Sequence, residues 1–95
     1  MKPFRYRLTA VQRVRDRREN EATEHYARAL AVRANALQAV ERAERELAAG
    51  QLECSNLLGL GAPAGDIRQC QSFCTVLQEA RVAAVRQLEQ AEIQL

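Results

Sequence analysis

The chain has 95 residues, and 14 basic side chains against 12 acidic ones give it a net charge of +2. Alanine (17 residues) and glutamine (9 residues) dominate the composition, whereas aromatic residues and glycine number only four each. This length and composition exclude a multidomain protein, an all-β domain and a doubly wound sheet, and they favour long helices.

The distribution of charge and apolar residues limits where the protein works. No apolar run approaches the roughly 18–20 residues of a membrane span, and the N-terminal segment lacks the apolar stretch of a secretory signal. We therefore expect a cytosolic protein whose three cysteines are reduced. Residues 1–18 carry a charge of +6 and residues 19–95 a charge of −4. The basic end is suited to an acidic protein surface, nucleic acid or anionic lipid.

Helical spacing predicts a first helix over about 3–58. Pro3 suits the first turn of a helix, and Phe4, Leu8 and Val11 recur on one face. The same face continues to residue 57, and no proline interrupts it. At 1.5 Å per residue, a helix of this length measures about 80 Å, so we expect a rod instead of a globule.

A glycine- and proline-rich segment at 59–66 predicts a turn, followed by a second helix over about 67–95 with Asp66 as its N-cap. Apolar residues in the second helix recur alternately three and four positions apart, the heptad pattern of coiled coils. The predicted fold class is all-α, a two-helix antiparallel coiled-coil hairpin forming a single domain over 1–95. If the turn centres near Ala62, residue i faces residue 124−i. The seam residues are then Val40, Leu47, Cys54, Ile67, Cys70, Leu77 and Leu88.

The same register leaves the N-terminal part of the first helix unmatched. Leu95 faces about Ala29, so the basic segment 1–28 has no predicted partner within the chain. Its apolar residues would then lie on a single helix unless another molecule covers them. Because the heptad pattern is still strong at residue 95, we expect the chain to be truncated.

No group of residues predicts catalysis, a cofactor or a small-molecule substrate, and His25 is expected on a solvated face. The register brings Cys54, Cys70 and Cys74 together. We interpret them as small core residues and predict no metal site, because a structural zinc site requires a fourth ligand that the sequence does not offer. A soft-metal or redox role is the alternative. A Cys54–Cys70 disulfide is geometrically possible under oxidation, as an artefact.

The N-terminal motif and the turn together resemble the FliJ family, the small coiled-coil proteins of the bacterial flagellar type III export apparatus. Members of this family open with an aromatic and basic stretch, a Leu-x-x-Val-x-x-Val/Leu-Arg turn and a Glu/Ala-rich helix. The matching positions here are Phe4, Arg5, Tyr6, Arg7, Leu8, Val11, Val14, Arg15, Arg17, Glu19, Glu21 and Ala22. The turn from Gly61 to Ile67 also fits the family, and the injectisome counterpart has the same architecture.

This resemblance implies a non-enzymatic protein at the cytoplasmic side of the inner membrane export apparatus. Its implied partners are the export ATPase ring, the export-gate membrane protein and export chaperones. The implied ATPase contacts are Arg5, Arg7, Arg13, Arg15, Arg17 and Arg18. The implied export-gate contacts are Phe73, Leu77, Ala80 and Ala84, which equally fit a widened coiled-coil core.

Two other functions remain open at this stage. The run of arginines before a coiled coil is also found in nucleic-acid-binding proteins, although leucine does not recur every seven residues after it. A self-associating rod that pairs through residues 1–28 is the other alternative.

The chain also departs from the family in its second helix, which is longer in typical members.

Overall fold

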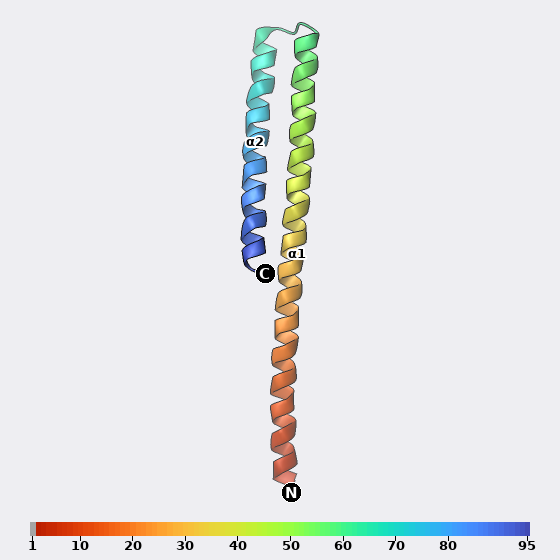
Figure 1. Ribbon diagram of the computed structural model, residues 1–95, viewed down its shortest axis with the longest axis vertical. Coiled ribbons are helices and arrows are strands. Elements are labelled where there is room, and N and C mark those ends of the chain that lie inside the picture. The colour runs from red at the N-terminus through yellow and green to blue at the C-terminus, as the bar shows by residue number, and fades with distance from the viewer. Residues whose placement is uncertain (1) are drawn as a thin grey trace.

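The computed structural model describes the backbone of residues 2–95 and the side chains of residues 7–95. Helix α1 spans Lys2–Gly59 and helix α2 spans Ala64–Ile93. The two helices lie side by side and run in opposite directions, joined by a short turn at one end of the molecule (Figure 1). The described residues contain no strand. This arrangement confirms the predicted all-α antiparallel hairpin.

The molecule is a rod that measures 91 × 15 × 14 Å. Its radius of gyration is 25.4 Å, whereas a globular domain of this length would have a value of about 12 Å. The rod is longer than the paired part of the hairpin, because α1 extends well past the C-terminal end of α2 (Figure 1). A surface helix packed on one neighbour alone can bury only one stripe of side chains, which limits the core.

The turn comprises residues 60–63 and is shorter than the predicted 59–66. The backbone N–H groups of Leu60 and Ala62 donate hydrogen bonds to the carbonyl oxygens of Asn56 and Leu57, at 3.0 and 3.1 Å. Gly61 adopts a left-handed conformation with φ of 69°, which glycine reaches without the steric cost of a side chain. These bonds satisfy carbonyl groups that the end of α1 would otherwise leave unpaired.

The predicted N-cap of the second helix is wrong. Pro63, not Asp66, holds the N-cap position of α2, with φ of −57° and ψ of 146°, and its carbonyl accepts the N–H groups of Asp66 and Ile67. The helix therefore begins three residues before the predicted start at residue 67. Asp66 lies in the first turn instead, where its negative charge is favourable beside the helix N-terminus.

The buried core is a thin seam between the helices. Its most buried apolar residues are Ala91, Val40 and Cys54, with 5%, 8% and 9% of their surface exposed. The other predicted seam residues are half-buried, namely Leu47, Ile67, Cys70, Leu77 and Leu88. Because two helices cannot enclose a side chain on all sides, the large apolar residues stay partly wet.

The two helices approach each other closely at Gly50. A Cβ atom at this position would lie 2.9 Å from Cδ1 of Leu77 and 3.4 Å from Sγ of Cys74. Glycine in the interior of a helix costs about 1 kcal/mol relative to alanine. Its position against Leu77 explains how α1 accommodates it, since the missing side chain makes room for the neighbouring helix.

The predicted register is confirmed where the structure gives direct contacts. Cys54 lies opposite Cys70, with a Cα–Cα distance of 5.7 Å, and Gly50 lies against Cys74. Two ion pairs join the helices further along, Arg81 to Glu44 at 3.6 Å and Arg33 to Glu92 at 3.8 Å. Their side chains are roughly half exposed, so each pair contributes at most about 1 kcal/mol.

Candidate functional site

The N-terminal segment of α1 presents side chains that no part of α2 covers. Every described side chain over residues 7–28 is exposed, and Figure 1 shows this part of α1 beyond the end of α2. The exposed set includes large apolar residues, with exposed fractions of 50% for Leu8, 54% for Val11, 48% for Val14 and 57% for Tyr26. They continue the stripe that further along α1 packs against α2.

Arginine side chains surround this stripe. Arg7, Arg13, Arg15, Arg17 and Arg18 are all exposed. None of these five makes an ion pair with an acidic side chain among the residues that the structure describes. The side chain of Arg5, the sixth predicted contact, lies outside the described residues.

A shallow groove runs along this part of α1. Arg15 and Arg18 line it together with Ala10, Val11 and Val14. The two guanidinium groups therefore border an apolar strip. The segment as a whole combines exposed apolar area with unneutralised positive charge, a combination that suits an acidic partner with an apolar patch.

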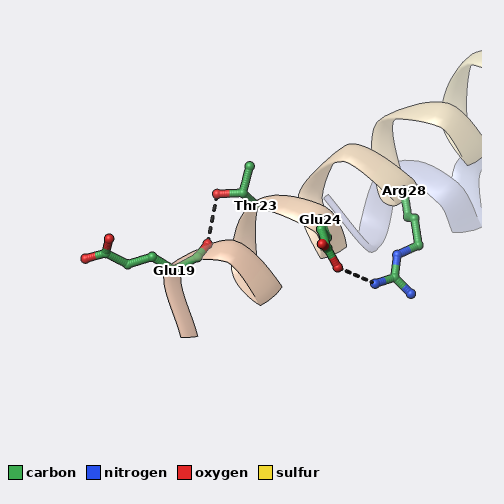
Figure 2. A network of polar contacts seen from close by, with 4 residues as sticks. All are labelled: Glu19, Thr23, Glu24 and Arg28. Carbon is green, nitrogen blue, oxygen red and sulfur yellow. Dashed lines mark hydrogen bonds and ion pairs between the residues drawn. The ribbon is translucent and has the colours of Figure 1, made fainter. Parts of the chain in front are cut away.

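Side chains make two contacts within the next described stretch of α1, residues 19–28. Figure 2 shows the Thr23 hydroxyl, which donates a hydrogen bond to the carbonyl oxygen of Glu19 at 2.9 Å, and Arg28, which lies 3.6 Å from the carboxylate of Glu24. Both contacts join residues four apart on one helix. An exposed pair of this kind contributes only about 0.3–0.5 kcal/mol. The stretch therefore gains little stability from these contacts.

The four predicted export-gate residues do not form one exposed face. Phe73 is 56% exposed and Ala80 is exposed, whereas Leu77 and Ala84 are half-buried. Leu77 packs against Gly50 of α1. Val76, which is 58% exposed, lies three positions after Phe73 on α2. The free apolar surface of α2 therefore includes Phe73 and Val76, while Leu77 belongs to the helix interface.

Apolar residues are also exposed at the hairpin tip. Leu58 is 58% exposed and Leu60 is 82% exposed. Neither was predicted as an interaction residue, because Leu58 ends the predicted first helix and Leu60 lies in the glycine-rich turn. Large apolar residues at or beside a turn can make few contacts within the chain. This combination is the signal that could have identified Leu58 and Leu60.

The three cysteines form a cluster across the two helices near the tip. Cys54 of α1 and Cys70 of α2 are joined by a disulfide, and Cys74 is free. The expectation that all three are reduced is therefore wrong for Cys54 and Cys70. The register places these two residues directly opposite each other, and their Cα–Cα distance lies within the range that a disulfide requires. The Cys74 sulfur lies 3.4 Å from that of Cys54.

Among the described residues, no helix has both the length and the apolar character needed to cross a membrane.

Comparison with known proteins identifies the family. The family model described as "Flagellar FliJ protein" matches residues 4–95, nearly the whole chain. No curated protein and no solved structure matched the chain. The chain belongs to the FliJ family, which confirms the resemblance seen in its sequence and indicates a component of flagellar protein export.

Proposed function

We propose that this member of the FliJ family acts without catalysis, as a rod that couples the export ATPase to the export gate and escorts export chaperones. Family membership supports the export role in general. The observation that carries the specific proposal is the free basic segment of α1, where exposed arginines border an exposed apolar stripe.

The charge of this segment favours the ATPase ring as its partner. Residues 1–18 carry +6, and the rest of the chain is acidic overall. Such polarity orients a rod as it approaches an acidic surface, so that the basic end enters first. The apolar stripe that includes Leu8, Val11 and Tyr26 would then be covered by the ring, which would add hydrophobic stabilisation to the electrostatic attraction.

The exposed apolar surface of α2 is the proposed contact for the export gate. Phe73 and Val76 lie on α2, within the paired part of the hairpin, and offer free apolar area. Both are more than half exposed, so they can be buried against another protein without opening the helix interface. A contact of this kind would hold the chain at the cytoplasmic face of the inner membrane as a peripheral component.

The experiment that tests the ATPase contact is a pull-down with the purified export ATPase. The variant Arg13→Glu/Arg17→Glu changes the charge of the basic segment by −4, and we expect it to abolish retention. The matched control is Arg42→Glu/Arg45→Glu, which makes the same change at exposed positions within the paired part of α1. Equal retention of the two variants would refute the assignment of this segment.

A second arm addresses the gate surface. Phe73→Ser should weaken binding to the cytoplasmic domain of the gate protein and leave ATPase binding unchanged. The control is Val32→Ser on α1, where the side chain is 52% exposed. If Phe73→Ser and Val32→Ser bind the gate domain equally well, the α2 surface is not the contact.

A further inference from the structure

The cysteine cluster brings three sulfur atoms from two helices to one point. Cys54 projects from α1, and Cys70 and Cys74 lie one turn apart on α2. The three sulfur atoms all lie within 4.8 Å of one another. Within the described part of the chain, no histidine or carboxylate joins this group of ligands. The cluster therefore offers a donor set made of sulfur alone.

The spacing of the sulfur atoms fits a single metal ion. A bond of about 2.3 Å from a metal to each thiolate sulfur places the sulfur atoms roughly 3.8–4.0 Å apart. The separation of Cys54 and Cys74 is 3.4 Å, and no pair exceeds 4.8 Å. Cys54 and Cys70 are joined by a disulfide, whose sulfur atoms are about 2.05 Å apart. Once this bond is broken, these two sulfur atoms have to separate by roughly 1.8–2 Å, which rotation of the two side chains about their Cα–Cβ bonds provides.

The surroundings give an ion a route to the cluster from the surface. Gly50 lies beside Cys74, and a Cβ atom there would lie 3.4 Å from its sulfur. A shallow surface depression opens at the cluster. Its lining residues are Gln51, Cys54, Ser55, Leu58, Gln71 and Cys74. Cys70 and Cys74 are half-buried, whereas Cys54 is only 9% exposed, so the cluster is held between the helices and is partly open to solvent at Cys70 and Cys74.

We propose that the reduced protein binds one soft monovalent metal ion, Cu(I), through the thiolates of Cys54, Cys70 and Cys74, and that the disulfide closes this site. Thiolate ligands select soft ions such as Cu(I). A structural zinc ion takes four protein ligands, and the cluster supplies three. Cu(I) accepts three sulfur ligands, so the absence of a fourth ligand in this group favours it.

Oxidation state controls the site. Two equivalents of a thiol reductant break the Sγ–Sγ bond between Cys54 and Cys70, pass two electrons to these sulfurs and are themselves oxidised to a disulfide. Binding of Cu(I) then forms three copper–sulfur bonds and releases three thiol protons to solvent, with no change in the oxidation state of copper. The oxidised protein retains one thiol, that of Cys74, and one thiolate is too few ligands for tight binding.

An anaerobic titration of the full chain tests the proposal. The protein is reduced with a phosphine that is then removed, and Cu(I) is supplied in competition with a chromogenic chelator. We expect one ion per chain, with the ultraviolet absorption band of thiolate-bound copper. Loss of an outer-shell partner of a metal site typically weakens binding about 10–100-fold. Each of Cys54→Ser, Cys70→Ser and Cys74→Ser removes a ligand, and each should weaken binding by more than about 100-fold.

A matched variant distinguishes the effect of the arrangement of the three thiols on Cu(I) affinity from the effect of their number. Cys74→Ser/Ser72→Cys keeps three thiols but moves one to an exposed position on another face of α2. It should bind as weakly as Cys74→Ser, and the oxidised wild-type chain should not bind. Retained affinity in this variant or in Cys74→Ser would overturn the proposal, as would absence of stoichiometric binding or equal affinity for Zn²⁺. Circular dichroism of each variant checks that the hairpin stays folded.

Discussion

Replacement of Gly50 by alanine is the sharpest test of the helix packing. In the interior of a solvated helix, this change would stabilise the protein by about 1 kcal/mol, because alanine is the better helix former. At this position, however, the new Cβ would lie 2.9 Å from Cδ1 of Leu77. Carbon atoms prefer a separation of about 3.5–4.0 Å, so one of the two groups has to move by roughly 0.6–1 Å.

The size of the effect follows from these opposing contributions. Overpacking of a filled interface costs about 1–3 kcal/mol, and the gain in helix propensity offsets about 1 kcal/mol of this cost. We expect Gly50→Ala to lower the free energy of unfolding by about 1 kcal/mol. The two contributions leave a net loss of about 0–2 kcal/mol. The upper end of this range is not reached because Leu77 is half-buried, and its side chain can swing partly towards solvent.

The assay is urea denaturation followed by far-ultraviolet circular dichroism, with the disulfide intact in every variant. Gly65→Ala is the matched control, since it is also helical and its new Cβ would meet no atom within 4 Å. It should raise the free energy of unfolding by up to about 1 kcal/mol. In a Leu77→Ala background, the penalty of Gly50→Ala should disappear. If Gly50→Ala stabilises the protein as much as Gly65→Ala, the close approach of the helices at this point is refuted.

Three further predictions concern the seam and its cross-links. Val40→Ala removes two buried methyl groups and should lower the free energy of unfolding by about 1.5–2.5 kcal/mol. The control Val32→Ala, at a 52% exposed position, should change the free energy of unfolding by less than about 0.5 kcal/mol. Equal losses in the two variants would contradict the assigned core face. Reduction of the disulfide opens a loop whose ends are 16 positions apart and should lower the free energy of unfolding by about 3 kcal/mol. This loss is measured as a shift of the midpoint of urea denaturation. An unchanged midpoint would mean that the cross-link does not restrict the unfolded chain. Glu44→Gln removes the pair with Arg81 and should cost less than about 1 kcal/mol in dilute buffer and nothing measurable in 1 M salt; a larger or salt-independent loss would show that Glu44 acts through another contact.

Patterns in the sequence predict both helices, but they place the start of α2 three residues too late. The absence of proline over 4–62 and the regular apolar spacing predict α1 to within a residue at each end. Asp66 has the residue type and the following glutamine of an N-cap. Pro63 holds the position instead, because its fixed φ suits the residue that precedes a helix, and Ala64 and Gly65 then join the first turn. Several residues near a turn can act as caps, so residue type alone does not decide between them.

The interaction surfaces show a similar division. Spacing along α2 places Phe73 and Leu77 on neighbouring positions of one face, but only the packing against α1 separates them. Leu77 meets Gly50 and is half-buried, whereas Phe73 remains 56% exposed. Helical periodicity gives the direction of a side chain around its own axis. It does not give the distance to a second helix, and this distance decides which flanking residues stay free.

The sequence by itself determined the helical class, the hairpin, its register and the family, because each of these depends on periodic patterns and short motifs that lie along the chain. The tertiary structure decided how closely the helices approach at Gly50, which residue caps α2, and that the sulfur atoms of Cys54, Cys70 and Cys74 lie within 4.8 Å of one another. These features depend on distances between atoms of different helices. A difference of about an ångström between two helices decides whether side chains form a contact, a disulfide or a set of metal ligands, or remain unconnected. A pattern of residues along the chain does not determine distances between helices to that precision.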